Sequence, residues 1–482
     1  MQLKEIKSGE VGGGLHFGSE GDFAFPTAGG KVRVAVTGDT LTPYGGLVPW
    51  AAFTRHLGVF ERLAASSPVT RTSPNAAPVY DVVQSFALTA LTDGRRFAHI
   101  ERLREDPAVP ELFGLESVVG DDTVRRFFAT VDPAVGAEWI AQCAAPLWQA
   151  LPARMIMDWD STVQPKYGHQ EGAERGYNPT KPGRRSFHPL LAVIAGTRLC
   201  PAYRFRSGDT VTATQWQAAM TDAQRWLGPQ KVWLNRGDLG LGHEAVMRWH
   251  ETGVGRPEYL FKLKLSPGVR RQALAVPEAA WQGPATVGAW QVAEVKLRLF
   301  GWTTERRVVL ARCRQGEVSA AQAGAFWDEC KHEYAAYVTS LTEGTCNAWQ
   351  IMALYRQRAD TENVFDELKN QWGFSGFCGR KRAITELAAR LLLLVYNLWV
   401  LFVRFLQPQA HVEAGRGRRW FLLIAARLVQ RGRQKELQLA VSGGWLEKLK
   451  DGYLRLHEWI HSTAPQLKTA TATTAYVAPV CT

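Results

Sequence analysis

The sequence predicts a mixed α/β protein in which helical regions precede and follow a central sheet. Its 482 residues exceed what one hydrophobic core usually serves, and 46% hydrophobic with 21% charged residues exclude wholesale disorder. Strand and helix patterns alternate only in the middle of the chain. We therefore expect a mostly helical N-terminal domain over 1–150, an α/β domain over 151–375 interrupted by a β insertion at about 270–342, and a basic helical region with a frayed tail over 376–482.

The N-terminal region changes character near residue 47. Before it, Gly and Thr are frequent, and the alternating run 31–36 predicts one short strand. From 47 to about 150 apolar residues recur three or four apart, as in helices that bury one face. The arginines on these helices suit a DNA-binding domain and equally suit the solvated surface of a helical bundle.

The central region has the order of an α/β sheet. Strand patterns at 153–160, 189–196 and 200–208 precede a helix at 214–228, a strand at 231–238, a helix at 242–253 and a strand at 258–265. This order predicts one mixed sheet covered by helices. The alternating runs 290–300 and 305–314 indicate an antiparallel insertion rather than a continuation of that unit. Helical periodicity then returns at Asn347 and runs to about 460.

The positive charge is concentrated near the C-terminus. The chain has 57 Lys and Arg against 45 Asp and Glu, a net charge of +12, and the span 380–433 alone carries +9. Such a surplus favours a nucleic-acid partner. A membrane is disfavoured because the apolar run 391–403 is only 13 residues long, so we predict a buried helix there. Seven scattered cysteines without a C-x-x-C pair suit a reducing cytoplasm, and no signal peptide is visible.

Two aspartates stand where predicted strands end. Asp160 ends the strand at 153–160, and Asp238 ends the strand at 231–238 before a glycine-rich segment. Carboxylates at strand ends can hold the divalent ions that promote phosphodiester chemistry. Asp158 shares a strand face with Asp160 but lies inside the strand, and Asp209 is a comparable acidic residue in a turn.

A third carboxylate lies on a predicted helix over 354–373. Tyr355, Arg358, Glu362 and Lys369 are spaced by three, four and seven residues, which places them on one stripe of a continuous helix. A stripe of these polar residues cannot be a core face. Leu354, with Val364, Phe365 and Leu368, would carry the packing.

The spacing Y-x-x-R-x-x-x-E-x-x-x-x-x-x-K closely resembles the signature of bacterial insertion-sequence DDE transposases with an RNase H-like catalytic domain. The segments DWDST, YGHQEGAERGYNPTKPGRRSFHPLLA and LNRGDLGLG resemble that family's aspartate blocks in the same order. The resemblance implies that Asp160, Asp238 and Glu362 are catalytic and bind two Mg²⁺ or Mn²⁺ ions. It implies phosphate contacts by Tyr355, Arg358 and Lys369, to which we add the basic residues Arg380, Lys381, Arg382, Arg416, Arg418 and Arg419.

The resemblance also carries expectations about partners and place. A transposase binds the terminal inverted repeats of its element as double-stranded DNA, cleaves the ends and joins the 3′-OH groups to target DNA. Whether a hairpin intermediate forms is left open. We expect a homodimer that holds two ends, with the helix around Trp445, Leu446 and Leu449 assisting. We expect no membrane, no nucleotide cofactor, and a bacterial cytoplasm near the nucleoid.

Three other interpretations compete with this one. The motif HEWIH at 457–461 matches the zinc-protease pattern, but the remaining 21 residues offer no His, Asp or Glu as a third ligand. A related RNase H-like nuclease or recombinase without strand transfer remains an alternative. A DNA-binding relative without catalysis is disfavoured because all three carboxylates are present.

Overall fold

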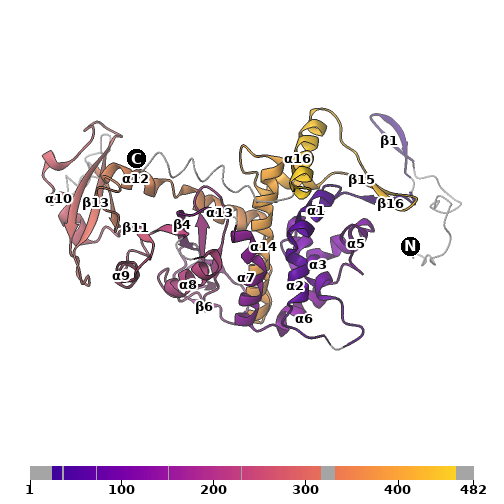
Figure 1. Ribbon diagram of the computed structural model, residues 1–482, viewed down its shortest axis with the longest axis horizontal. Coiled ribbons are helices and arrows are strands. Elements are labelled where there is room, and N and C mark those ends of the chain that lie inside the picture. The colour runs from indigo at the N-terminus through magenta and orange to yellow at the C-terminus, as the bar shows by residue number, and fades with distance from the viewer. Residues whose placement is uncertain are drawn as a thin grey trace.

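The computed structural model describes residues 24–34, 37–71, 73–149, 151–228, 231–315 and 332–462. Its centre is an eight-stranded mixed sheet in the order β12-β13-β14-β11-β10-β4-β8-β9. Along the long axis, Figure 1 shows β13 and its neighbours at one end, then the central strands, then α14, and most of the N-terminal helices beyond it. The sheet strands are β4 Met155–Ser161, β8 Leu190–Ile194, β9 Ala202–Arg204, β10 Val232–Gly237, β11 Glu258–Lys262, β12 Trp290–Leu297, β13 Arg306–Arg314 and β14 His332–Thr339.

The five central strands follow the predicted positions. β4 pairs parallel with β10 and antiparallel with β8, while β10 and β11 are parallel and β8 and β9 are antiparallel. The parallel pairs need crossover connections, and α8 (Trp216–Leu227) and α9 (Glu244–Thr252) provide them. The mixed sheet expected from the strand and helix order is therefore present.

The two faces of β4 differ in chemistry. Met157 and Trp159 belong to the core that includes α8 and α9, whereas Ile156 belongs to the core formed with α12 (Ala348–Arg356). Because side chains alternate along a strand, Asp158 and Asp160 share the face of Ile156. Both aspartates are thus directed to the α12 side of the sheet.

The strands after β11 extend the same sheet. β12 and β13 match the predicted runs, and β13 pairs with a third strand, β14, that the sequence analysis did not predict. β14 also pairs antiparallel with β11. The expectation of an antiparallel segment set apart from the α/β unit was wrong on this point, because β14 continues the hydrogen bonding from one to the other.

The predicted helix over 354–373 is interrupted. α12 ends at Arg356, and α13 (Ala359–Gln371) begins after a turn in which Arg358 caps the new helix. The Arg358 amide bonds Tyr355 one residue short of the α-helical spacing. Period alone could not predict this break, because no proline or glycine marks it.

Helices pack on both sides of one long apolar helix. α14 (Arg382–Leu406) is long and apolar enough to cross a bilayer, but 94% of its most apolar window is buried inside the protein. It is a core helix, as predicted, because a helix that is apolar all round must be covered. The N-terminal helices are α1 Leu47–Leu57, α2 Val59–Ala65, α3 Val79–Leu91, α4 Glu101–Arg104, α5 Ala108–Phe113, α6 Asp121–Thr130 and α7 Pro133–Gln149.

The C-terminal region is not helical throughout. β15 (Ala426–Arg431) and β16 (Gln434–Leu439) form a hairpin that pairs with β3 (Thr40–Thr42). The prediction of helix over this stretch was wrong, because the hairpin is stabilised by a partner strand almost 400 residues away in sequence. α16 (Gly444–Ile460) follows and packs against α14.

The remaining described elements are short. In the N-terminal region β1 Ala24–Thr27 and β2 Gly30–Arg33 form a hairpin. Of the strand predicted over 31–36, β2 covers the first three residues, and residues 35–36 lie outside the described ranges. The others are β5 Gln164–Pro165, β6 Glu174–Arg175, β7 Arg185–Phe187, α10 Pro267–Ala275, α15 Ala414–Gly417, and single turns at Phe97–Ile100, Glu278–Ala280 and Arg418–Leu422.

Candidate active site

Asp160 and Asp238 lie at the ends of neighbouring parallel strands. Asp160 is the last residue but one of β4, and Asp238 directly follows β10. Burial and the negative charge of Asp160 raise the pKa of Asp238, so the two carboxylates are close enough to repel each other. Backbone amides hold both: Ser161 N donates to Asp160 Oδ1 at 2.7 Å and Gly240 N to Asp238 Oδ1 at 3.0 Å.

Asp158, two residues earlier, has a different role. Its carboxylate forms a two-pronged ion pair with Arg236 of β10, at 2.6 and 2.7 Å, and both side chains are buried. Arg236 also donates to the Leu354 carbonyl of α12. This pair therefore joins β4, β10 and α12 beneath the site, and Asp158 has no free oxygen directed to a ligand.

Arg358 brings the helix side of the site to Asp160. Its guanidinium is 2.8 Å from Asp160 Oδ2 and donates to the Trp159 carbonyl at 3.0 Å. Burial disfavours its charge, but the carboxylate of Asp160 raises the pKa of Arg358 above its usual value. Its Nε is buried without a hydrogen-bond partner. Arg358 thus supplies the positive charge that two close carboxylates require.

Two other predicted site residues, Tyr355 and Lys369, also lie near this pair. Burial raises the pKa of Tyr355 to about 12, and the nearby charges include both aspartates. Loss of water lowers the pKa of Lys369, and the charge of Asp160 partly restores it. Both residues therefore lie within electrostatic range of the site.

Glu362 is the predicted site residue that the structure does not join to the others. It is exposed in the first turn of α13 and forms no ion pair with a residue of the site. Within the described residues, no three acidic, His or Cys side chains lie close enough to share a metal ion. The two aspartates alone fit a divalent ion by their chemistry, since their mutual repulsion is what such an ion relieves.

A buried polar chain on the other sheet face fixes the two strands. Trp159 Nε1 donates to Asn235 Oδ1 at 2.8 Å, and the Asn235 amide is 3.1 Å from His250 Nε2. Because Asn235 uses its oxygen for Trp159, its NH₂ must donate to His250, so the histidine proton is on Nδ1 and bonds the Val246 carbonyl at 2.8 Å. Burial lowers the pKa of His250 to about 4, which keeps it neutral.

A second network, which the sequence analysis missed, adjoins Asp160. Ser161 Oγ is 3.0 Å from His188 Nε2 and 2.9 Å from Thr212 Oγ1, and His188 Nδ1 bonds the Thr210 carbonyl at 2.7 Å. Burial lowers the pKa of His188. The HPLLA segment of the first aspartate block contained this histidine, but no spacing rule linked it to Ser161.

The basic residues predicted to contact DNA are in different surroundings. Arg380, Lys381, Arg416 and Arg419 are exposed, whereas Arg382 is half-buried and pairs with Glu386. Arg418 is 3% exposed and donates to the carbonyls of Leu91, Ala90 and Gln371. A DNA phosphate cannot reach it there, and we remove Arg418 from the DNA-binding set.

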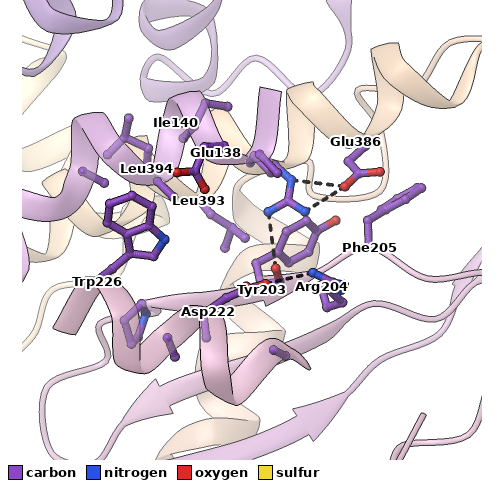
Figure 2. A pocket seen from close by; sticks show the side chains of 18 of the residues that line it. Glu138, Ile140, Tyr203, Arg204, Phe205, Asp222, Trp226, Glu386, Leu393 and Leu394 are labelled. Carbon is purple, nitrogen blue, oxygen red and sulfur yellow. Dashed lines mark hydrogen bonds and ion pairs between the residues drawn. The ribbon is translucent and has the colours of Figure 1, made fainter. Parts of the chain in front are cut away.

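A cavity of about 580 Å³ lies between α7, α8, β9 and α14. Figure 2 shows that Arg204 lies beside Asp222 on its rim and that Glu386 faces a guanidinium. These charges neutralise one another, and the cavity shares no residue with the aspartate pair. It is therefore not where we place the chemistry.

The HEWIH motif forms no zinc site among the described residues. His457 and His461 lie 4.2 Å apart at the end of α16, as the helical spacing predicts. No third acidic, His or Cys ligand joins them in the described ranges. Trp459 of the same motif packs on Phe53 and Phe405.

A search of curated proteins finds no match. A solved structure, "Cryo-EM structure of piggyBac transposase synaptic complex with hairpin DNA (SNHP)", is similar with a TM-score of 0.43 and 10% identity, covering 92% of this chain and 86% of the other. The family model described as Transposase DDE domain group 1 matches residues 25–459. The chain therefore belongs to the DDE transposase domain group 1 family.

Proposed function

We propose that this protein binds the terminal inverted repeats of its own insertion sequence, cleaves the ends by metal-dependent phosphodiester hydrolysis and joins the 3′-OH ends to target DNA. Membership in a DDE transposase family supports a DNA transposase. The observation that carries the proposal is that Asp160 and Asp238 lie at the same end of two neighbouring parallel strands. Arg358, which precedes α13, forms an ion pair with Asp160 there.

We propose further that the central strands are RNase H-like. In chain order, β4, β8 and β9 form antiparallel neighbours, and β10 and β11 come next and run parallel to β4. This order supports the assignment. In this arrangement the first and fourth strands of the unit carry the two aspartates. The domain boundaries at 1–150, 151–375 and 376–482 remain part of this proposal.

Asp160, Asp238 and Glu362 would hold two Mg²⁺ or Mn²⁺ ions. When bound, such ions lower the pKa of water and stabilise charge on the departing oxygen. Glu362 stands one turn after Arg358 on α13 and is exposed in this structure, so DNA and metal binding would have to join it to the aspartates. No nucleophilic side chain is needed, and the raised pKa of Tyr355 keeps its phenol protonated and a poor nucleophile.

Arg358, Lys369 and Tyr355 would hold the DNA phosphates beside the aspartates. In this structure the Arg358 guanidinium is buried against Asp160, so its contact with a phosphate would require that it become exposed when DNA binds. The exposed Arg380, Lys381, Arg416 and Arg419 would extend the contact along the duplex, with Arg382 at its margin.

Coordinated cutting of two ends calls for two protomers on paired DNA ends. The helix around Trp445 does not offer the surface we expected, because Trp445 stacks on Phe421 and Leu449 is 2% exposed. Leu446 alone of the three is directed outward. We keep the dimer as a proposal for the DNA-bound state, in the bacterial cytoplasm, without assigning it to that helix.

The test uses purified full-length protein, a labelled fragment of the element's end, and Mg²⁺, Mn²⁺ or EDTA. Cleavage should require metal, and Asp160→Ala, Asp238→Ala or Glu362→Ala should each abolish it while DNA binding persists. Tyr355→Phe should still cleave, since no covalent adduct forms. Robust cleavage by the Glu362→Ala variant, or a protein–DNA adduct lost in Tyr355→Phe, would overturn the scheme.

A target plasmid distinguishes the transposase from the nuclease alternative. Joined products should appear with precut ends that carry a 3′-OH and should be absent when that end is a 3′-deoxy nucleotide. Cleavage without any joined product would indicate a nuclease instead. A hairpin on the element's end would appear as a product of doubled length on a denaturing gel.

A further inference from the structure

We propose that the loop between β5 and β7, residues 166–185, binds unpaired nucleotides of the DNA strand that leaves the active site. This inference rests on the proposed function, since it concerns the DNA that the site would cut. We call the exposed tyrosine, lysine and arginine residues of this segment the loop surface. They are Tyr167, Arg175, Tyr177, Lys181, Arg184 and Arg185.

The loop begins and ends at the candidate active site. β4 carries Asp160 and ends at Ser161, and β5, which leads directly into the loop, begins three residues later at Gln164. Its far end returns through β7 to His188, whose ring is 3.0 Å from Ser161 Oγ. DNA held at Asp160 therefore has this loop as a neighbour on the protein surface.

The loop has a fixed shape. β5, β7 and β6 form a small three-stranded sheet, and the ammonium of Lys166 is buried and donates to the Ser375 carbonyl at 2.8 Å. Gly176 packs against Gly208 so closely that a Cβ at Gly176 would collide with that backbone. Its exposed side chains are thus presented by an ordered scaffold, which lowers the entropy lost on binding.

Two aromatic rings are exposed on this scaffold. Tyr167 is 68% and Tyr177 is 72% exposed, although aromatic side chains usually gain free energy by burial. The Lys181 ammonium and the Arg184 guanidinium lie 4.6 and 4.5 Å from the centre of the Tyr167 ring. Proteins that bind unpaired nucleic-acid strands present exposed aromatic rings beside cations, because bases stack on the rings while phosphates bind the cations.

The charge of the surroundings supports an anionic partner. Four of the six loop-surface residues are basic, and the acidic residues of the loop are Glu171 and Glu174, of which Glu174 lies 3.9 Å from Arg185. Glu171 is occupied: its amide bonds the Arg380 carbonyl and its carboxylate accepts from the Arg382 amide, each at 2.9 Å. These bonds place the loop beside Arg380 and Arg382, which are two of the predicted DNA-binding residues.

The experiment compares two probes, a blunt duplex and the same duplex with a four-nucleotide single-stranded extension, by fluorescence anisotropy with full-length protein. The wild type should prefer the extended probe. Tyr177→Ala should weaken binding to the extended probe roughly tenfold and leave the blunt duplex unchanged. Tyr177→Phe is the matched control and should bind like the wild type, because stacking needs the ring and not the hydroxyl.

The charge of the loop is tested separately with Arg184→Gln combined with Arg185→Gln. The double variant should make the slope of log K against log salt concentration shallower by about two. Unfolding temperatures of all variants should match the wild type, since the altered side chains are exposed.

The outcomes separate the two proposals. Equal binding of both probes by wild type and Tyr177→Ala, in a protein that still cleaves its ends, overturns the loop inference alone. Absence of any DNA binding by the wild type overturns both. Intact DNA binding with an unchanged salt slope in the arginine variant also overturns the inference and would indicate another partner for the loop.

Discussion

At the scale of single residues, alternation along β4 explains why neighbouring aspartates have different fates. Asp158 and Asp160 share a face, but Asp158 lies opposite Arg236 inside the sheet and Asp160 lies at the strand's end. The first is buried against a guanidinium, and the second is partly open to solvent. In the sequence only their positions along the strand distinguish the two aspartates, because the ion pair with Arg236 forms between residues 78 positions apart.

This difference predicts the effect of Asp158→Ala. Removing the carboxylate leaves the Arg236 guanidinium buried without its counter-ion, which should cost about 3–5 kcal/mol of unfolding free energy. Urea denaturation followed by circular dichroism measures it. Asp160→Ala is the comparison and should be less destabilising, because Arg358 keeps its bond to the Trp159 carbonyl and the charge of Asp238 still acts on it. Equal stability of the two variants would contradict this account.

At the scale of elements, contacts between distant segments decide what periodicity cannot. The helix over 354–373 breaks at Arg358, which pairs with Asp160 of the sheet, and residues 426–439 form strands that pair with β3. The order of the central strands needed no such information, since each is an apolar run bounded by turns. Elements stabilised mainly by local pattern were thus predicted, and those stabilised by a distant partner were not.

The His250 network should make the sheet sensitive to acid. Its folded-state pKa of about 4 lies below the ordinary value of 6.5, so the unfolded chain binds the proton more readily. The stability from this group is therefore complete above pH 6.5 and is lost as the pH falls toward 4. Thermal unfolding between pH 7.5 and 4 should show this loss. His250→Gln should show a smaller loss over that range, and an unchanged pH dependence would contradict the assignment.

At the scale of the whole molecule, the basic span 380–433 is divided by the fold. Much of it forms α14 and its surroundings, so only some of its charges reach the surface. Arg416 and Arg419 are exposed, whereas Arg418 between them bonds backbone carbonyls of α3 and α13. Net charge in a stretch of sequence is therefore a poor count of phosphate contacts.

This division predicts two separable effects on DNA binding. Arg416→Gln with Arg419→Gln should weaken binding to all sequences about equally and lower the salt slope by about two, with unchanged unfolding. Arg418→Gln should instead lower the unfolding free energy, because it removes the link between α3 and α13. Binding measured from 50 to 200 mM salt, together with urea denaturation, distinguishes the two. A salt slope that changed only in Arg418→Gln would contradict the assignment.

The sequence by itself determined the order of the central strands, the buried character of α14 and the two aspartates that end β4 and β10. These follow from local chemistry: apolar runs, alternation, and carboxylates placed where strands stop. Only the tertiary structure decided that Arg358 pairs with Asp160, that Arg236 neutralises Asp158 and that Arg418 is buried. A charged side chain's role depends on the water and the opposite charges around it, and both are set by residues far away in the chain.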